Sequence, residues 1–308
     1  MRAALLKKYA SVGSVQIDIV DVPEPSVNQV QVEVYAASVN PFDYKVRDGL
    51  MKQTMPLDLP IILGGDVAGI ITALGEGVTD FSIGDKIYGQ ANATKQGSFA
   101  EYTIVDISQM ALMPKTDYLT AAALPLVACS AYQALSHLEV KPHQNILIHG
   151  GAGGIGGMAI QIAKYFGLNI ATTVSQNDKA YVKSLGADLA IDYHKEDFTK
   201  LVKDYDYVFD LVGGQSFTKS YEVLKPGGKI ISMVNETNPQ LDAKFEVTSI
   251  HQFTQVSTEK LNFIAELVNQ HRISVNIDRQ FNLAETSLAL DYLKNDHPKG
   301  KVVIQVKA

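Results

Sequence analysis

Hydrophobic and polar residues alternate in the first third of the chain. Three valines alternate with Gln31, Glu33 and Tyr35 over residues 30–35, which is the period of two expected for a half-buried strand. Glycines that predict turns interrupt the following segments, at positions 75, 77, 84, 89 and 97. Short strands separated by such turns predict an antiparallel, barrel-like domain.

From about residue 116 the pattern changes to alternating strands and helices. Short apolar runs predict strands at residues 145–149, 169–174, 189–193, 206–212 and 229–234. Amphipathic stretches lie between them, such as residues 179–185, which Gly186 closes as a C-terminal cap. Apolar strands separated by helices predict a doubly wound parallel sheet covered on both faces.

The tail carries a further helix and strand. Residues 259–271 predict a helix with an apolar face, and residues 301–306 predict a last strand. Residues 121–135 form a small-residue apolar stretch that predicts one helix, with Cys129 packed inside it. Nothing nearby in the sequence would lower the pKa of this thiol, so a packing role is favoured over a nucleophilic one.

Composition narrows the class of protein. The 308 residues correspond to about two domains. A formal charge of −6 with no basic block disfavours nucleic acids and anionic membranes as partners. The single cysteine excludes a disulfide framework and a multi-cysteine zinc site, and it fits a reducing cytosol. With no signal peptide and no stretch able to span a bilayer, we expect a cytoplasmic, soluble protein.

A glycine-rich loop follows the first predicted strand of the parallel sheet and opens a helix. Gly151, Gly153 and Gly156 satisfy Gly-x-Gly-x-x-Gly, with Gly154 and Ile155 between them. Such a loop makes a tight turn, lets the backbone approach a pyrophosphate and places its charge at a helix N-terminus. These five residues are therefore candidate dinucleotide-binding residues, and the alternative is a merely glycine-rich turn.

The choice of cofactor depends on the end of the second strand of this sheet. NAD-binding proteins usually carry an acid there, whereas here the strand ends at Val174 and continues into Ser175, Asn177 and Lys179. These three side chains can donate to a 2′-phosphate, which predicts NADPH as the cofactor. In the alternative interpretation, Asn177 or Asp178 caps a helix and Lys179 is a solvated charge in its first turn.

Motifs in a fixed order resemble the medium-chain dehydrogenase/reductase superfamily, and most closely its zinc-independent quinone oxidoreductases and enone/alkenal reductases. They include residues 40–45 (NPFDYK), 64–69 (GGDVAG), 84–88 (GDKIY), 97–102 (GSFAEY), 124–126 (LPL), 130–132 (SAY), 184–188 (SLGAD), 191–193 (IDY) and 300–303 (GKVV). The resemblance covers essentially the whole chain.

The resemblance implies a domain organisation. A GroES-like antiparallel β-barrel catalytic domain would comprise residues 1–117 and 253–308, around a Rossmann domain of residues 118–252. The nicotinamide would lie in a cleft between them, and pairing into a homodimer is common in the family. Ser130 matches a threonine close to the cofactor, although its hydroxyl could simply bond back along its helix. Tyr193 and Lys301, within matched motifs, are further cofactor-binding candidates.

The resemblance also predicts that no metal is bound. Zinc-dependent relatives hold catalytic zinc with a cysteine near the position of Asn40 and a histidine–glutamate pair where this chain has Gly65 and Asp66. The four-cysteine structural site is missing as well.

Without metal, hydrogen-bond donors must stabilise the negative charge that hydride transfer places on a carbonyl oxygen. Candidates are Lys45, Asn40, Tyr44 and Tyr88. Lys45 leads because it matches a lysine of the enone reductases' Asn-Pro-x-Asp-x-Lys motif. Alternatively Lys45 is a solvated surface charge, Tyr88 a core residue and Asn40 part of a turn.

These inferences predict an NADPH-dependent, zinc-independent oxidoreductase that transfers hydride to quinones or α,β-unsaturated carbonyls. The alternative is a nucleotide-binding regulatory or structural protein with little turnover, since a fold alone does not imply activity. The residues do not select a particular quinone or enone as the substrate.

Overall fold

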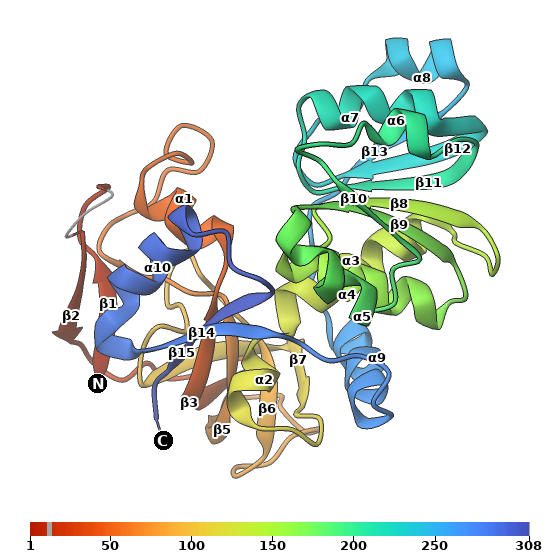
Figure 1. Cartoon of the computed structure of the whole chain (residues 1–308). Coiled ribbons are helices and arrows are strands. Elements are labelled where there is room, and N and C mark those ends of the chain that lie inside the picture. The colour runs from red at the N-terminus through yellow and green to blue at the C-terminus, as the bar shows by residue number, and fades with distance from the viewer. Residues whose placement is uncertain (11–13, 308) are drawn as a thin grey trace. The chain divides into compact units, whose positions relative to one another are not determined.

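The computed structural model describes residues 1–10 and 14–307. The chain forms two compact units: unit 1 comprises Met1–Leu126, Val256–Gln270 and Val275–Ala308, and unit 2 comprises Val127–Gln255 and His271–Ser274. Both ends of the chain therefore contribute to unit 1 (Figure 1). We retain the sequence-based boundaries after residues 117 and 252 as a proposal for the catalytic and nucleotide-binding domains.

Unit 1 is centred on a sheet of six strands. These are Gln29–Val39 (β3), Asp66–Leu74 (β5), Lys86–Ala91 (β6), Tyr102–Leu112 (β7), Ile277–Asn282 (β14) and Lys301–Gln305 (β15). They run in the order β14-β15-β3-β5-β6-β7, and β3 also pairs with β7, so four antiparallel strands close into a ring. The predicted antiparallel, barrel-like domain is confirmed, with the parallel pair β14–β15 as an addition.

A smaller sheet and several helices complete unit 1. The sheet has the order β2-β1-β4, from Arg2–Leu6 (β1), Val15–Ile19 (β2) and Ile61–Ile62 (β4). The helices are Pro41–Arg47 (α1), Tyr118–Ala122 (α2), Thr258–Asn269 (α9), Thr286–Asn295 (α10) and the 3-10 turn Leu283–Glu285 (η3). The predicted tail helix and last strand thus exist as α9 and β15.

The alternating valines of β3 face the core of unit 1. Val30, Val32 and Val34 are at most 1% exposed, and they pack with apolar side chains such as Ile71 and Met110 from neighbouring strands. Burying each valine is worth about 1.5–3 kcal/mol, which fixes the register of the strand.

Unit 2 contains a parallel sheet of six strands. These are Asn145–His149 (β8), Asn169–Val174 (β9), Leu189–Asp192 (β10), Tyr205–Asp210 (β11), Leu224–Ser232 (β12) and Thr248–His251 (β13). Their order, β10-β9-β8-β11-β12-β13, reverses between β8 and β11. The five predicted strands are confirmed to within a few residues at their ends. Strand β13 was not predicted, because its four residues show neither an apolar run nor clean alternation.

Helices cover both faces of this sheet, as predicted (Figure 1). One face carries Pro125–Leu138 (α3), Gly154–Tyr165 (α4) and Lys179–Ser184 (α5), the last preceded by the 3-10 turn Gln176–Asp178 (η1). The other carries Phe198–Leu201 (α6), Gln215–Ser220 (α7), the 3-10 turn Tyr221–Val223 (η2) and Pro239–Phe245 (α8).

The apolar stretch of residues 121–135 is not one helix. It is divided between α2, which ends at Ala122, and α3, which begins at Pro125. Proline has no N–H to continue the earlier helix and fits the first turn of a new one. Cys129 is buried within α3. In the part of the chain that is described, no helix is both long and apolar enough to cross a bilayer.

Candidate functional site

The glycine turn joins β8 to α4 in unit 2. A Cβ on Gly151 would lie 2.1 Å from the Thr172 hydroxyl oxygen, and one on Gly156 would lie 2.2 Å from the Gly150 carbonyl oxygen. Packing therefore demands glycine at both positions. Gly153 differs, because its φ is −74° and the nearest atom to an added Cβ lies at 3.5 Å. Packing within the protein would therefore allow a side chain at Gly153. The missing Cβ leaves space for a bound ligand.

The N-terminus of α4 suits a phosphate. Gly153 is the N-cap and provides no side chain to accept from the first helical N–H groups, which include those of Gly154 and Ile155. Free N–H groups and the helix dipole both favour an anion at this end of the 12-residue helix. The turn and the helix end thus fit the pyrophosphate of a dinucleotide.

A buried histidine supports the start of this turn. His149 Nε2 lies 2.9 Å from the Ser220 hydroxyl oxygen, and Nδ1 lies 3.0 Å from that of Thr173. The Ser220 hydroxyl donates to the Ser216 carbonyl oxygen, so it can only accept from His149. Nε2 of His149 therefore carries the proton, and Nδ1 accepts from the Thr173 hydroxyl. Burial lowers the pKa of His149 to about 4, against the opposing charge of Asp210, which fits this neutral ring.

The end of β9 carries the candidates for the 2′-phosphate. The Ser175 hydroxyl donates to Asp178 at 2.6 Å, and Asn177 is exposed on η1. Lys179 Nζ lies 2.5 Å from Glu196 Oε2, which also accepts from the Asp192 N–H. The structure brings these three candidates to one strand end, but the charge of Lys179 is already paired with an acid that the sequence analysis did not consider.

Tyr193 and Ser130 lie elsewhere in unit 2. Tyr193 is 59% exposed and directly follows β10, and its ring centroid lies 4.2 Å from that of His194. Ser130 is buried in α3, and its hydroxyl lies 2.6 Å from that of Thr254. Its contact therefore links α3 to the segment after β13 rather than only to its own helix.

The carboxyl ends of the strands in unit 2 carry polar atoms and apolar side chains that the sequence analysis missed. Asp192 Oδ2, His251 Nε2 and Gln252 Oε1 are buried acceptors without a partner among the described residues, at the ends of β10 and β13. Exposed apolar side chains follow three adjacent strands: Val212, Val234 and Phe253. Open sheets of this type bind ligands beyond this edge, so both features fit a nucleotide.

Unit 1 holds a buried polar cluster around Lys301. Lys301 Nζ donates to the Asn40 side-chain oxygen at 2.5 Å and to the Val39 carbonyl at 3.0 Å. The Asn40 amide in turn donates to Asp66 at 2.8 Å, and the Asn40 N–H donates to Asp43 at 2.7 Å. Asn40 and Lys301, predicted separately, are thus direct partners. The polar atoms of both side chains hydrogen-bond to other residues of unit 1.

Burial changes the acid–base properties of this cluster. It raises the pKa of Asp43 to about 7; the Asn40 N–H opposes the rise, and the nearby Asp66 charge adds to it. Burial also lowers the pKa of Lys301, against the attraction of Asp66 and Asp43. Among the described residues, no group of three or more His, Cys, Asp or Glu side chains could hold a metal ion.

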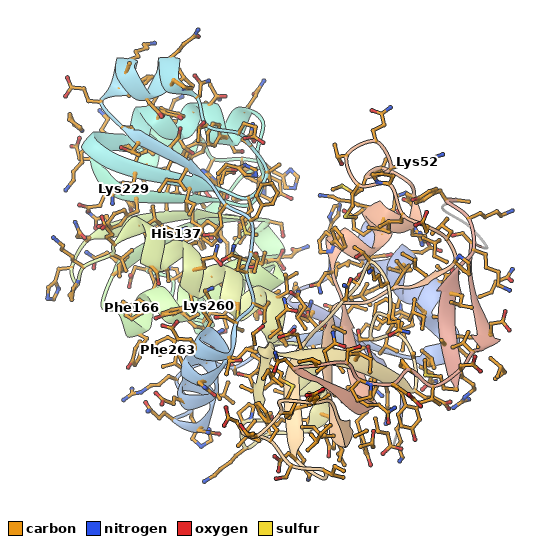
Figure 2. All side chains as sticks on the ribbon, turned by 180° about the vertical axis from the view of Figure 1, so that it is seen from behind. Lys52, His137, Phe166, Lys229, Lys260 and Phe263 are labelled. Atoms are coloured by element: carbon orange, nitrogen blue, oxygen red, sulfur yellow. The ribbon has the colours of Figure 1, made fainter. Side chains whose placement is uncertain are left out.

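The remaining donor candidates differ in their environment. Lys45 is exposed on α1, and its ammonium has neither an ion pair nor a hydrogen bond with any described residue. Tyr44 is half-buried against the core of unit 1. Tyr88 is fully buried in β6, and its hydroxyl donates to the Leu261 carbonyl at 2.5 Å. Another lysine, Lys52, lies on the loop after α1 (Figure 2). Its Nζ lies 5.5 Å from the Tyr9 ring centroid.

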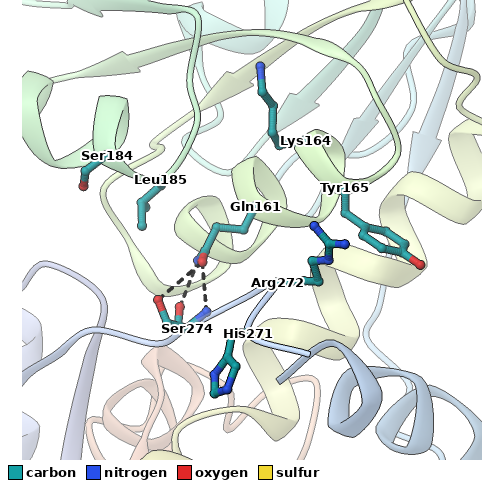
Figure 3. A pocket seen from close by; sticks show the side chains of 8 residues that line it. All are labelled: Gln161, Lys164, Tyr165, Ser184, Leu185, His271, Arg272 and Ser274. Atoms are coloured by element: carbon teal, nitrogen blue, oxygen red, sulfur yellow. Dashed lines mark hydrogen bonds between the residues drawn. The ribbon is translucent and has the colours of Figure 1, made fainter. Parts of the chain in front are cut away.

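A pocket of about 510 Å³ lies at the other end of α4 (Figure 3). Its lining comes from the last turns of α4, from α5 and from the segment after α9: Gln161, Lys164, Tyr165, Ser184, Leu185, His271, Arg272 and Ser274. Gln161 fixes that segment by accepting from the Ser274 N–H and donating to its carbonyl, both at 2.9 Å. The pocket is roughly 15 Å along the helix from the glycine turn, so it is separate from the candidate nucleotide site.

Comparison with known proteins gives the family. The alcohol dehydrogenase GroES-like domain family matches residues 26–115, and the zinc-binding dehydrogenase family matches residues 185–304. NADPH-dependent alkenal/one oxidoreductase of Arabidopsis thaliana is 35% identical over 99% of this chain and 79% of its own length. The chain belongs to the medium-chain dehydrogenase/reductase superfamily.

Other members of the superfamily agree with this assignment. The 2-methylene-furan-3-one reductase of Solanum lycopersicum is 36% identical over 99% of this chain and 79% of its own length. The solved structure of the quinone oxidoreductase from Coxiella burnetii has a TM-score of 0.92 and 33% identity, covering 100% of this chain and 99% of that chain. A mycobacterial protein solved in complex with NADPH has a TM-score of 0.88 and 26% identity, covering 99% and 100%.

Membership of this superfamily establishes the general chemistry of the protein. It is an NAD(P)H-dependent oxidoreductase of the quinone oxidoreductase and alkenal reductase group, with a Rossmann-like parallel sheet and a GroES-like antiparallel domain. The role of each candidate residue stays a prediction. Glu196, His251 and Gln252 are not evident as site residues from the sequence. Glu196 lies four residues beyond the end of β10, and His251 and Gln252 lie at the end of β13, which no apolar run marks.

Proposed function

We propose that the protein is an NADPH-dependent, zinc-independent reductase of quinones and α,β-unsaturated carbonyls. The observation that carries the proposal is the similarity over 99% of the chain to two relatives whose names describe conjugated carbonyl substrates: alkenals and alkenones for one, a 2-methylene-furan-3-one for the other. Such substrates take up hydride at the β-carbon and leave negative charge on the oxygen, which a protein donor must stabilise.

Lys45 is the proposed donor to that oxygen. Its exposed ammonium has no partner among the described residues, while the side-chain N–H groups of Asn40 and Lys301 donate to neighbouring residues within their cluster. Asn40 and Lys301 therefore act as positioning residues that anchor the start of α1. Lys301 is also a cation placed beside Asn40, the position where the resemblance puts a zinc-ligating cysteine. This supports a metal-independent reaction.

NADPH is the proposed cofactor. The turn at Gly153 and the start of α4 would hold the pyrophosphate, and Ser175, Asn177 and Lys179 would meet the 2′-phosphate. When bound, the cofactor supplies the hydride. The protein orients it and excludes water.

The oligomeric state and the compartment belong to the same proposal. We propose a homodimer, for which the free edge of β13 offers unpaired backbone groups, and a cytoplasmic location. The names of relatives mark some of them as chloroplastic or mitochondrial. Light scattering of the purified protein and localisation of a tagged chain test these two points.

A substrate panel tests the activity. Purified protein is given NADPH with phenanthrenequinone, a short enone or a saturated aldehyde, in the presence and absence of a chelator. We expect NADPH oxidation with the quinone and the enone, little with the aldehyde, and no effect of the chelator. Absence of turnover with all three, despite NADPH binding, would favour the regulatory or structural alternative.

A further inference from the structure

One side-chain oxygen at the carboxyl edge of the parallel sheet has no explanation within the fold. Gln252 follows β13 directly and is only 2% exposed. Its Nε2 donates to the Ser130 carbonyl oxygen at 3.0 Å, whereas its Oε1 has no partner among the described residues. A buried acceptor left unpaired is costly, so such an atom points to a donor from a ligand.

The orientation of this amide is fixed by its surroundings. Exchanging its oxygen and nitrogen would place Oε1 against the Ser130 carbonyl, where two acceptors repel each other. The neighbouring segment is also bonded to α3. Gln133 donates to the Phe253 carbonyl at 2.8 Å and accepts from the Gln255 N–H at 2.9 Å. Gln252 Oε1 is therefore a preorganised acceptor.

The strand order suggests which part of a dinucleotide lies nearby. The order reverses between β8 and β11, and the glycine turn follows β8. If the 2′-phosphate lies at the end of β9, the other half of the cofactor extends over β11, β12 and β13. Val212, Val234 and Phe253 are exposed at these three strand ends, and they suit a flat, weakly polar ring.

We propose that Gln252 Oε1 accepts a hydrogen bond from the carboxamide N–H of the nicotinamide and so fixes the orientation of the ring. This inference rests on the proposed use of a nicotinamide cofactor. The carboxamide is the hydrogen-bond donor of that ring, and Gln252 would act as a cofactor-positioning residue that selects for it.

A comparison of two cofactors isolates this contact. The acetylpyridine analogue of NADPH has a methyl ketone in place of the carboxamide and so lacks its N–H groups. Dissociation constants of both cofactors are measured by calorimetry for the wild type and for Gln252→Met, which keeps the side-chain volume. We expect Gln252→Met to weaken NADPH binding about tenfold and to leave the analogue within about twofold.

Two further variants separate the contact from structural effects. Gln133→Met removes the bonds that anchor the same segment, and it should weaken both cofactors equally. Gln252→Glu is expected to be protonated in this buried position, so that its hydroxyl donates to the Ser130 carbonyl and its other oxygen remains an acceptor. This variant should retain a preference for NADPH over the analogue even if Gln252→Met proves unstable. Equal loss of both cofactors in Gln252→Met, or no preference in Gln252→Glu, would overturn the proposal. Failure of the wild type to bind either cofactor would instead contradict the proposed function.

Discussion

Two lysines of unit 1 have opposite environments, and this difference separates their chemistry. Lys301 is 3% exposed, and its ammonium donates to Asn40 and Val39. Lys45 is exposed on α1, and no described residue pairs with its ammonium. A donor to a substrate oxygen has to keep its N–H groups available. This is why we propose Lys45 as the donor and Lys301 as a residue that positions Asn40.

Replacing Lys45 tests the donor directly. Lys45→Met keeps the aliphatic stem and removes the charge, so packing is preserved. We expect kcat for an enone to fall about a hundred- to a thousandfold with cofactor affinity unchanged, because the oxygen becomes charged only as hydride arrives. The effect on a quinone should be smaller, since its product anion is delocalised. Lys52→Met, on the neighbouring loop, is the matched control. Near-normal enone turnover in Lys45→Met would remove this residue from the mechanism.

The ion pair at the end of β9 governs the expected cofactor preference. Lys179 is bound to Glu196 in the free protein, so a 2′-phosphate has to compete with that carboxylate. Lys179→Ala should weaken NADPH by about tenfold and leave NADH nearly unchanged, because only NADPH has the phosphate. Glu196→Gln should have the opposite effect on NADPH. Equal changes for both cofactors, measured by titration, would show that Lys179 does not contact the phosphate.

Sequence motifs could identify single candidates but not their partners. Lys45 and Asn40 stand in one motif, whereas the group that bonds to Asn40 is 261 residues away. Burial of Lys301 and pairing of Lys179 with Glu196 depend on how separate strands come together. Local patterns carry no information on such contacts.

The strand–turn–helix unit formed by β8 and α4 was predictable because its glycines form a short motif between an apolar run and a helix. The structure adds that these glycines serve different purposes. Gly151 and Gly156 fit only without a side chain, whereas Gly153 has space for one. The four-residue strand β13 was not predicted because it has no periodic pattern. The break at Pro125 was not predicted because the continuous apolar stretch was given more weight than the local effect of the proline.

Alanine at two of these glycines should have separable effects. Gly153→Ala should leave the midpoint of thermal unfolding within a few degrees of the wild type but weaken NADPH at least tenfold, because its methyl group would occupy the space of the pyrophosphate. Gly156→Ala should lower stability, since its Cβ would lie 2.2 Å from the Gly150 carbonyl oxygen. Unchanged cofactor affinity in Gly153→Ala would place the pyrophosphate elsewhere.

For the whole molecule, two buried groups give stability an opposing dependence on pH. His149 has a pKa of about 4 in the fold, against 6.5 as its ordinary value, so its contribution to stability is lost as pH falls through that window. Asp43 has a pKa of about 7, against 3.8, so its protonated form adds stability at low pH that is lost as pH rises through that window. Their effects partly cancel in the wild type.

A variant separates the two contributions. Of these two contributions to the pH dependence of stability, only that of Asp43 remains in His149→Gln. We expect the stability advantage of the wild type over His149→Gln to shrink by about 3 kcal/mol as pH falls from 6.5 to 4, measured by urea unfolding. A difference that stays constant over this range would mean that His149 is not held neutral by burial.

We propose that hydride passes from NADPH to the β-carbon of a conjugated carbonyl without a metal, and isotope labelling tests this step. NADPH with deuterium at both C4 positions of the nicotinamide is incubated with an enone and the protein in the presence of a chelator, and the product is analysed by NMR. We expect a saturated ketone with one deuterium on the β-carbon and a solvent proton on the α-carbon. Deuterium on the carbonyl carbon, or a reaction that stops when the chelator is added, would contradict it.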